Sequence, residues 1–390
     1  MAGAVVLILN TGSSSVKFAL HDATSRDRIA HGAIEGVGRT PDLTLKTSQG
    51  SQILHPDPGQ GRDMGTLIDW LLATLDSALG PLGLVGAGHR VVHGGQDFDA
   101  PARITEDVLR RLDALCPLAP GHQPYNLMGI RAVAARWPDC PQIACFDTAF
   151  HRNRPRHAQL FALPRDLSEA GILRYGFHGL SYDHIAGCLR DVLGPERAQG
   201  RVIVAHLGSG ASLCAMAGGQ SVDTTMGFTA LDGLMMGTRC GQIDPGVLIH
   251  LMRETGMDAD ALERLLGKES GLLGVSGISS DMRDLLDNPT PEATEAVALF
   301  VHMIQRHIGA LTASLGGLDA LVFTAGIGER SPVIRARVMA GLGWLGLTPD
   351  EDANAENRTL ISTGDSHLTA AMIPTDEEGV ILRALLEMRG

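Results

Sequence analysis

Four cationic side chains stand in segments rich in glycine or serine, where each could bind negatively charged oxygens. Arg90 lies in the segment HRVVHGG and Arg239 lies in MMGTRCG. A guanidinium is a planar, permanently charged fork that suits carboxylate and phosphate oxygens better than an ammonium does. Lys17 follows the segment NTGSSS, and His178 lies in YGFHG. Each alone is more often a surface or structural residue, but the glycines imply close backbone approach, so the set indicates anion binding.

Three glycine-rich turns are expected to bind phosphate, because each follows a run of apolar residues. They cover Asn10–Ser15, His206–Gly210 and Thr324–Arg330. Backbone N–H groups and hydroxyls in such turns can gather around an anion. The third turn stands between an apolar strand and a helix expected to start near Pro332, a context in which helix N-termini meet phosphate. Together these turns predict a nucleotide-binding protein.

Two other glycine patterns are set aside, and one carboxylate is kept open. Gly267–Lys268 is followed by Glu269, so the chain has no Walker A motif. The spacing GxGxxG occurs at Gly341–Gly346, but it follows a helical pattern, so a helix end with a turn is the better interpretation. Asp147 follows an apolar strand, where it is either catalytic or a helix cap.

The elements that must position these residues alternate between strands and helices. Residues 5–9 and 16–20 form a predicted β-hairpin, and residues 202–205 and 211–216 repeat the pattern about half a chain later. This repetition indicates internal duplication, and the alternation favours an α/β fold. The predicted helices are Thr66–Leu79, Thr105–Leu115, Ser181–Arg190, Glu292–Leu315, Pro332–Ala340 and Glu377–Met388, and further strands are predicted at Gln142–Phe146 and Ala320–Phe323.

The length of 390 residues is sufficient for two domains. The basic, proline-containing stretch His151–His157 follows a strand, so we place the boundary near residue 150. The last helix has no obvious partner nearby in the sequence. We therefore expect a first domain of residues 1–150, completed by a C-terminal helix in residues 375–390, and a second, nucleotide-binding domain of residues 151–374.

Composition excludes several classes of function. The formal net charge of -12 argues against general affinity for nucleic acids or membrane surfaces, although a local anion pocket remains compatible with it. The six cysteines form no CxxC pair, which favours reduced thiols. The apolar run Ala4–Leu9 is too short for a signal sequence, and no stretch approaches the roughly 20 residues of a membrane span. We expect a soluble, cytoplasmic protein.

Taken in order, the motifs resemble those of the acetate kinase family. The resemblance runs from Leu7 to Arg383 and is carried by LNTGSSSVKF, HRVVHGG, LAPGHQP, FDTAFH, RYGFHGLSY, HLGSGAS, GFTALDGLMMGTRCGQIDPG, TAGIGER and IPTDEE. It implies two ribonuclease-H-like domains, the duplicated fold of the actin, sugar kinase and heat-shock chaperone superfamily, with a cleft between them. It implies reversible, Mg²⁺-dependent phosphoryl transfer from ATP to acetate, giving acetyl phosphate and ADP, with Mn²⁺ as a substitute metal. It also implies a homodimer.

The same resemblance implies roles for matching residues. Asn10 and Glu377 would hold Mg²⁺ through its waters, and Asp147 is similar to the family's essential aspartate. The carboxylate would be gripped by Arg90 and Arg239, while Arg239 and His178 would stabilise the moving phosphoryl group. Ser13, Ser15 and Lys17 would lie near the transferred phosphate, and the acyl pocket would include Val92, Gly121, Phe177 and Ala230. Ser13, Ser15 and Lys17 would also bind ATP. The other ATP-binding positions would be His206, Leu207, Gly208, Ser209, Gly210, Asp281, Met282, Arg283, Gly326, Ile327, Gly328, Glu329 and Arg330.

Physical chemistry makes these roles coherent. A short carboxylic acid ionises at a pH of about 4, so the nucleophile is already an anion at neutral pH and needs no general base. We therefore expect Asp147 to orient Arg239 or a metal-bound water. The barrier lies in bringing two anions together, so catalysis should consist of positioning and cationic stabilisation of a loose transition state.

Several residues depart from the family pattern. Gly121 stands where a leucine is usual and Ala230 where a proline is usual, which should enlarge the acyl pocket unless a neighbouring side chain fills the space. Propionate would then be accepted comparatively well, although neutral drift explains the changes equally well. Ser209, Arg330 and Asp376 each replace a usual asparagine, which leaves nucleotide affinity and base preference open.

Three other functions compete with acetate phosphorylation. The pocket changes could specialise the enzyme for propionate or butyrate. The chain could instead be a nucleotide-gated member of the superfamily without acyl transfer, but a pure ATP sensor needs no second anion site. A sugar or glycerol kinase would need a base for its hydroxyl nucleophile, whereas paired arginines favour a carboxylate.

Overall fold

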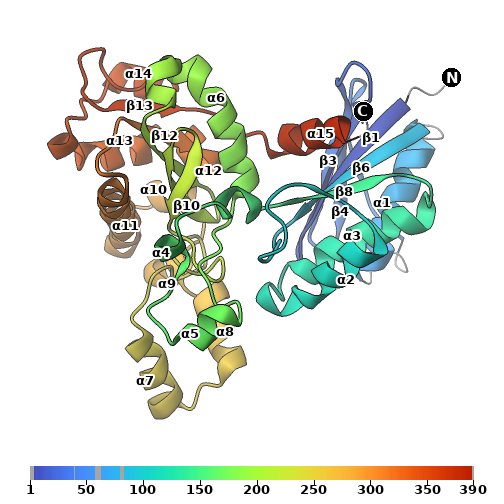
Figure 1. Ribbon diagram of the computed structural model, residues 1–390, viewed down its shortest axis with the longest axis horizontal. Helices are drawn as coiled ribbons and strands as arrows, with labels where there is room; N and C mark the ends of the chain where they lie inside the picture. Colours follow the sequence, from blue (N-terminus) through green and yellow to red (C-terminus); the bar gives the residue numbers. More distant parts are fainter. Residues whose placement is uncertain (1–3, 39, 58–62, 80–82, 389–390) are drawn as a thin grey trace. The chain divides into compact units, whose positions relative to one another are not determined.

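The computed structural model describes residues 4–38, 40–57, 63–79 and 83–388. The chain forms two compact units. Unit 1 contains the residues up to Phe150 together with those from Asp376 onwards, and unit 2 contains His151–Thr375. Each unit is an α/β structure with one sheet, as the colours of Figure 1 allow the reader to follow.

The sheet of unit 1 has the strand order β5-β4-β3-β2-β1-β6-β8-β7. Strands β1 to β5 form antiparallel pairs in sequence order, while β1, β6 and β8 run parallel to one another. The predicted first hairpin is therefore present as β1 and β2. The strand bounds are β1 Ala4–Thr11, β2 Val16–Asp22, β3 Arg28–Glu35, β4 Asp42–Thr47, β5 Gly50–Leu54, β6 Gly83–Val91, β7 Ala102–Arg103 and β8 Gln142–Phe146.

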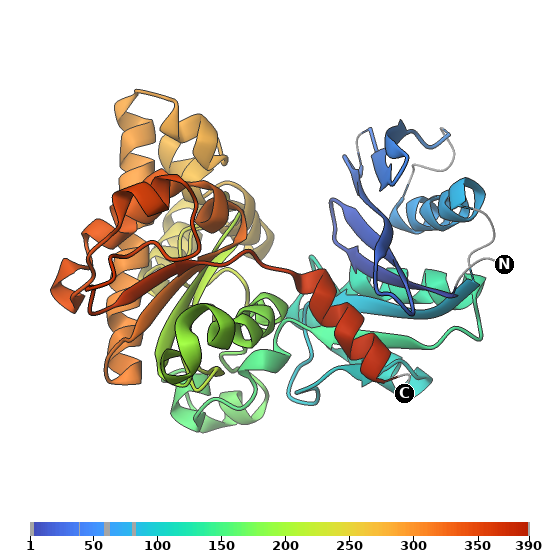
Figure 2. The ribbon, with the colours of Figure 1, turned by 90° about the horizontal axis from the view of Figure 1, so that it is seen from above.

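Helices cover both faces of the parallel part of this sheet. A Cβ on Gly88 of β6 would collide with Ile381 of α15, whereas His89, the next residue, faces Gly129 of α3. Because successive residues of a strand point to opposite faces, α15 and α3 lie on opposite sides. Figure 2 shows α15, in red, crossing one face of this sheet. The helix bounds are α1 Met64–Leu79, α2 Glu106–Ala114, η1 Cys116–Leu118, α3 Gln123–Arg136, η2 Ala149–His151 and α15 Glu377–Glu387.

The sheet of unit 2 repeats the central part of the first one. Its order is β11-β10-β9-β12-β13, with β9, β10 and β11 antiparallel and with β9, β12 and β13 parallel. The series β3-β2-β1-β6-β8 in unit 1 has the same order and directions, so the structure confirms the predicted duplication. The bounds are β9 Arg201–Leu207, β10 Ala211–Ala217, β11 Gln220–Thr224, β12 Ala320–Thr324 and β13 Thr369–Met372.

Two long helices pack on opposite sides of this second sheet in Figures 1 and 2. They are α6, Gly179–Ala198, and α11, Pro291–Leu315. The apolar stripe of α11 is buried, and Thr290 caps its first turn by accepting a hydrogen bond from the N–H of Ala293. The remaining helices of unit 2 are α4 Arg156–Gln159, α5 Arg165–Glu169, α7 Pro245–Thr255, α8 Ala259–Lys268, α9 Gly271–Ser276, α10 Met282–Leu286, α12 Ala325–Arg330, α13 Pro332–Ala340, η3 Gly343–Leu345 and α14 Glu351–Ala355.

Two of the three expected phosphate-binding turns differ from the prediction. Strand β9 continues through His206 and Leu207, so only Gly208–Gly210 form the turn before β10. The third segment is not a turn, because Ala325–Arg330 form the short helix α12, which follows β12 directly. Ala325 makes the bend with a positive φ of 64°. The prediction of a helix end and turn at Gly341–Gly346 is confirmed, since α13 ends at Ala340.

Within the described residues, no helix combines the length and apolarity needed to cross a membrane.

Candidate functional site

The first group of expected site residues lies in unit 1, at the carboxyl ends of three adjacent parallel strands. Leu9 pairs with His89, and Arg90 pairs with Cys145 in the sheet register. Asn10, Arg90 and Asp147 therefore follow one another across the ends of β1, β6 and β8. Such strand ends are where ligands bind in open α/β sheets.

Arg90, which is 22% exposed, and the buried Asp147 form an ion pair in this group. The guanidinium donates two hydrogen bonds to the carboxylate, with Nε 2.9 Å from Oδ1 and a terminal nitrogen 2.7 Å from Oδ2. The Asp147 side chain is 3% exposed, and the carboxylate of Glu377 lies 3.9 Å from Arg90 Nε. Burial alone would lower the pKa of Arg90, but the charges of Asp147 and Glu377 outweigh it and raise that pKa. Arg90 is thus a permanently charged, oriented cation.

This ion pair gives Asp147 a contact that the sequence did not predict. The structure places the aspartate on Arg90, a partner that sequence reasoning missed because the two residues are 57 positions apart. Burial raises the pKa of the Asp147 carboxyl, while the charge and hydrogen bonds of Arg90 oppose that rise. Its expected action on Arg239 or on a metal-bound water stays a hypothesis.

The β1–β2 hairpin supplies the serines and the lysine of the first group. Asn10 stands directly opposite Lys17 in the antiparallel register, so their side chains share one face of the hairpin. The turn closes through a 2.9 Å hydrogen bond from Gly12 N to Ser15 O. Ser13 and Lys17 are exposed, and Ser15 is half-buried. These polar groups are therefore available to an anion.

The expected acyl-pocket residue Val92 follows β6 and is held by the first turns of α3. Its backbone N–H donates to Oδ1 of Asn126 at 3.0 Å, and the amide nitrogen of Asn126 donates to Thr11 O at 2.5 Å. Asn126 thereby joins the end of β1 to the segment after β6. Gly121 lies before α3 and is exposed, and a Cβ on it would meet no atom within 4 Å. Among the residues that the structure describes, no side chain therefore approaches the position of a Cβ at residue 121.

The chemistry of Asn10 and Glu377 fits a Mg²⁺ ion. Magnesium prefers hard oxygen ligands and commonly takes one or two from the protein, with waters and substrate phosphates completing the shell. The Asn10 amide and the Glu377 carboxylate offer such oxygens, and the Glu377 side chain is 23% exposed. Among the residues that the structure describes, no cluster of three or more His, Cys, Asp or Glu could hold a metal by itself.

The second group lies in unit 2 and centres on the turn Gly208–Gly210. A Cβ on Gly210 would lie 3.3 Å from Nε2 of His178 and 3.5 Å from both terminal nitrogens of Arg239. Two cationic or proton-donating tips therefore meet the backbone at one glycine. A side chain at this position would be crowded, because both tips lie within 3.5 Å of the place where its Cβ would stand.

The loop that carries Arg239 is attached to this turn. The N–H of Gly237 donates to Ser209 O at 3.1 Å, and a terminal nitrogen of Arg239 donates to Ala230 O at 3.0 Å. Ala230, an expected acyl-pocket residue, thus helps to orient the arginine through its backbone. Phe177, the other expected pocket residue in unit 2, is buried at 2% exposure and precedes His178.

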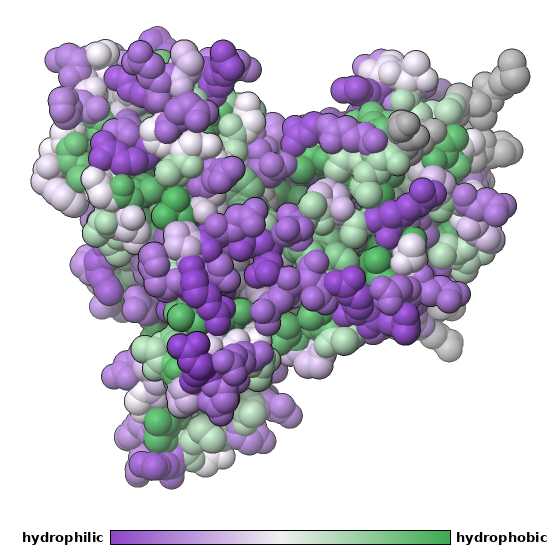
Figure 3. Space-filling model, viewed as in Figure 1, coloured by the Kyte–Doolittle hydropathy of each residue, from purple (hydrophilic) through white to green (hydrophobic). Residues whose placement is uncertain are grey.

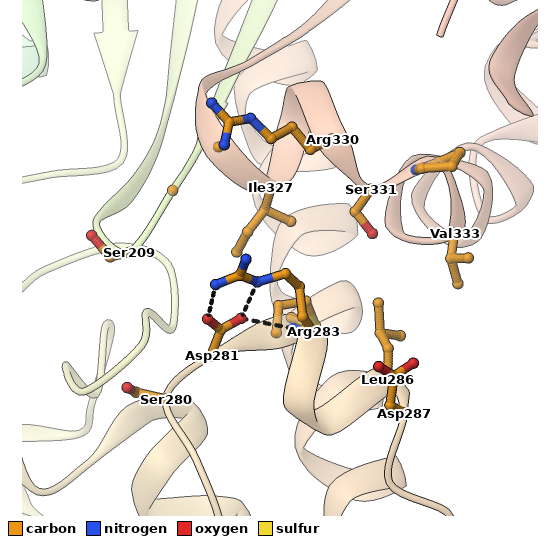
Figure 4. Close-up of a pocket in the computed structure, with 14 residues that line it drawn as sticks. Ser209, Ser280, Asp281, Arg283, Leu286, Asp287, Ile327, Arg330, Ser331 and Val333 are labelled. Carbon is orange, nitrogen blue, oxygen red and sulfur yellow. Dashed lines mark hydrogen bonds and ion pairs between the residues drawn. The ribbon is translucent and has the colours of Figure 1, made fainter. Parts of the chain in front are cut away.

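A pocket of about 650 Å³ adjoins Gly208 and Ser209. Figure 4 shows Ile327 of α12 pointing toward Asp281 and Arg283 at the start of α10, with Arg330 farther from that pair. Arg283 donates two hydrogen bonds to Asp281, and these bonds hold the pKa of the Asp281 carboxyl below its usual value. The pocket contains eight of the expected ATP-binding residues: Gly208, Ser209, Asp281, Met282, Arg283, Gly326, Ile327 and Arg330.

Sequence reasoning missed six residues that line this pocket. They come from the segment before α10, the end of α10 and the start of α13: Ser280, Leu286, Asp287, Ser331, Pro332 and Val333. The expected helix start at Pro332 beside a glycine-rich segment was a signal for the last three. The remaining expected ATP-binding residues are not among the lining residues: Ser13, Ser15 and Lys17 of unit 1, and His206, Leu207, Gly210, Gly328 and Glu329 of unit 2.

The side chain of Glu329 forms hydrogen bonds with backbone groups of the protein. Its Oε1 accepts hydrogen bonds from the N–H groups of Ala325 at 2.9 Å and Thr375 at 3.0 Å. The hydroxyl of Thr375 lies 2.9 Å from that of Ser181, whose oxygen lies 2.8 Å from Nδ1 of His206. Glu329 therefore holds the first residue of α12 against the segment after β13 and shapes the pocket.

Comparison with known proteins finds acetate kinases and a propionate kinase that are similar over nearly their whole length. A chain 52% identical over 97% of both lengths is the acetate kinase of Rhodopseudomonas palustris. Porphyromonas gingivalis acetate kinase has a similar structure, with a TM-score of 0.90, 36% identity and full coverage of both chains. A propionate kinase from Francisella tularensis has a TM-score of 0.92 and 34% identity, covering 98% of this chain and 99% of its own.

The sequence model of the acetokinase family matches residues 5–383. That range includes both sheets, both groups of cationic side chains and the pocket residues. Since the match extends over nearly the whole chain and the relatives share its full length, the chain belongs to the acetokinase family.

Proposed function

We propose that this chain catalyses reversible phosphoryl transfer from ATP to acetate, giving acetyl phosphate and ADP. The observation that carries the proposal is the convergence of His178 Nε2 and Arg239 at Gly210, next to the pocket at Gly208 and Ser209. A nucleotide site alone does not need these two groups. A transferring phosphoryl group does, because its transition state carries negative charge on three oxygens.

The proposed roles combine the family resemblance with the contacts that orient each group. Arg90, held by Asp147, binds the acetate carboxylate, and the pocket of unit 2 binds ATP. Arg239 and the Nε2–H of His178 stabilise charge on the phosphoryl oxygens, while the hairpin with Lys17 contributes further donors. Asn10 and Glu377 would hold Mg²⁺ through its waters, and the ion would neutralise charge on the phosphate oxygens. The carboxylate attacks phosphorus directly as the bond to the ADP oxygen breaks, so no proton moves.

A hydroxylamine trap tests this function. Purified protein is incubated with ATP, Mg²⁺ and single carboxylates, and any acyl phosphate is measured as its hydroxamate. Acetyl hydroxamate is expected, and Arg239→Ala should lower kcat by about 1000-fold, the usual scale of an arginine in phosphoryl transfer. ATP hydrolysis without hydroxamate from any carboxylate would contradict the proposal and favour a nucleotide-gated protein.

A second candidate, preference for propionate, is favoured by the open space at Gly121. The ratio of kcat/KM for propionate to that for acetate should fall when Gly121 is changed to leucine, by about 10-fold, since one methylene is worth roughly 1–3 kcal/mol. An unchanged ratio in Gly121→Leu would show that this position does not shape acyl selectivity.

We also propose that two copies of the chain associate through a surface that includes α7. This helix has no buried residue, and Val247, Ile249 and Met252 are 40%, 48% and 50% exposed. The face of the molecule in Figure 3 mixes hydrophilic and hydrophobic residues. Exposed apolar side chains gathered on one helix are a common mark of an association surface. Light scattering should give twice the chain mass, and Ile249→Asp should reduce it. A monomer at all concentrations would refute the association.

A further inference from the structure

The ring of His178 is held firmly within unit 2. His178 precedes α6 with a positive φ of 61°, in a region that side chains other than glycine seldom adopt. Its ring stacks on that of His206, with centroids 4.1 Å apart and planes at 19°. Backbone strain of this kind persists where the surroundings enforce it, and it gathers at functional sites. Stacking on His206 therefore fixes the orientation of the His178 ring plane.

A pair of buried hydroxyls contacts the edge of the same ring. The Oγ of Ser212, on β10, lies 2.8 Å from Nδ1 of His178, and the hydroxyl of Tyr182 lies 2.5 Å from that Oγ. Ser212 and Tyr182 are both 0% exposed. The hydroxyl groups thus form a short chain from the first turn of α6 to the imidazole.

Either hydroxyl of this pair can donate to the other, and that choice decides which nitrogen of the imidazole carries the proton. When Tyr182 donates to Ser212, the hydrogen of Ser212 is directed to Nδ1, which then acts as an acceptor. The single proton of the neutral ring must stay on Nε2. Nε2 is the nitrogen that meets Gly210 together with Arg239. If the imidazole is protonated, both of its nitrogens carry hydrogen. The Ser212 hydroxyl then rotates and accepts from Nδ1, while Nε2 is a donor in that state too.

We propose that Ser212 and Tyr182 are positioning residues that keep Nε2 of His178 as a hydrogen-bond donor to the transferring phosphoryl group. The proposal rests on the proposed acyl kinase function. Without Tyr182, the hydrogen of Ser212 loses its fixed direction, and the ring can take the tautomer with a bare Nε2. That nitrogen would then repel phosphoryl oxygens instead of donating to them.

A double-mutant cycle tests whether Tyr182 and Ser212 act through His178. Tyr182→Phe removes one hydroxyl and little volume, and it should lower kcat by about 10-fold, the scale of one hydrogen bond, with both KM values changed by less than about twofold. In the His178→Ala background, assayed at high enzyme concentration, Tyr182→Phe should have no further effect. Ser212→Ala should behave in the same way, and Ser212→Thr should retain most of the activity.

Tyr175→Phe is the matched control. Tyr175 is 4% exposed and its hydroxyl donates to Gly171 O at 2.8 Å, so this variant also loses a buried, hydrogen-bonded phenol oxygen. It should keep wild-type kcat. Equal losses from Tyr182→Phe in the His178 and His178→Ala backgrounds, or wild-type kcat in Tyr182→Phe, would overturn the positioning role. A wild-type protein that forms no acyl phosphate would overturn the proposed function instead. If Tyr182→Phe does not fold, the Ser212→Ala cycle decides.

Discussion

At the scale of single residues, the two groups of cationic side chains are built in different ways. Arg90 is oriented by a buried carboxylate, whereas His178 is oriented by hydroxyls and an aromatic ring. Arg239 is oriented by a carbonyl oxygen, that of Ala230. A neutral partner leaves the full charge of a cation available to the substrate, while a carboxylate partner gives stronger orientation at the cost of part of that charge.

Replacing Asp147 by asparagine should weaken both activity and stability. The variant keeps an oxygen for Arg90 but leaves the mostly buried guanidinium without its main counter-charge. We expect kcat/KM for acetate to fall by about 100-fold and the free energy of unfolding to fall by about 2 kcal/mol. Steady-state kinetics and thermal unfolding measure these changes.

The matched control for Asp147→Asn is Asp113→Asn. Asp113 accepts two hydrogen bonds from Arg131 in unit 1, but both side chains are about half exposed. Its loss should cost less than about 1 kcal/mol and leave kcat/KM unchanged. Equal effects of the two substitutions would contradict a special role for the pair of Arg90 and Asp147.

Gly210→Ala should separate the two tips that meet at this glycine. The new methyl group would lie 3.3 Å from His178 Nε2, which is closer than ordinary van der Waals contact. We expect kcat to fall by about 10-fold or more, because displacement of catalytic groups is costly. Gly187→Ala, on the exposed surface of α6 with no atom within 4 Å, is the control and should keep full activity. An unchanged kcat in Gly210→Ala would show that a methyl group at this position does not displace His178 or Arg239.

At the scale of elements, the short helix α12 depends on a buried arginine. Arg335 of α13 is 0% exposed and donates to the carbonyl oxygens of Gly328 and Glu329, both at 2.9 Å. It also donates to Oδ1 of Asn354 at 2.7 Å. Burial lowers the pKa of Arg335. A buried guanidinium that binds neutral oxygens fixes the end of α12, and with it one wall of the pocket.

Arg335→Lys should therefore destabilise unit 2 and weaken ATP binding. An ammonium cannot reproduce the fork of a guanidinium, so carbonyl oxygens at the end of α12 would lose donors. We expect a loss of about 3 kcal/mol in stability and an increase of several-fold in the KM for ATP. Arg337→Lys, at an exposed position of the same helix, should change neither quantity. Thermal unfolding with and without ATP measures stability and ATP binding, and equal results for the two variants would contradict the prediction.

At the scale of the whole molecule, buried histidines occur in both units. Burial lowers the pKa of His89 and of His93 to about 4 in unit 1. Burial, followed by the charge of Arg154, lowers the pKa of His151 to about 3 in unit 2. These imidazoles are uncharged in the folded protein at neutral pH, whereas the unfolded chain binds protons below a pH of about 6.5.

Acid should therefore unfold the protein well above the pH at which most carboxylates titrate. Below a pH of about 6.5 the unfolded state binds more protons than the folded state, so stability falls as the pH decreases, down to about pH 4. Each histidine contributes on the order of 3 kcal/mol over that range. The thermal midpoint should drop accordingly, and less steeply in His151→Gln. His157→Gln, at an exposed position, should leave the profile unchanged, and a flat wild-type profile would contradict the prediction.

The sequence by itself determined the elements whose signals are local. The hairpin β1–β2, the duplication, and the strand β8 and helix α13 with their predicted bounds follow from periodicity and apolar runs. The motifs also indicated the cationic residues, because glycine beside a fixed charge is a local pattern. These features depend on residues that are close in the chain, which is why they can be predicted without the fold.

Only the tertiary structure decided which groups meet. Asp147 lies 57 residues from Arg90, and Ser212 lies 34 from His178, so no spacing rule connects them. The glycines of α12 disfavour a helix, but Arg335 and Glu329 supply hydrogen bonds that outweigh this preference. Contacts between distant segments depend on strand order and side-chain burial, and these arise from packing of the whole unit.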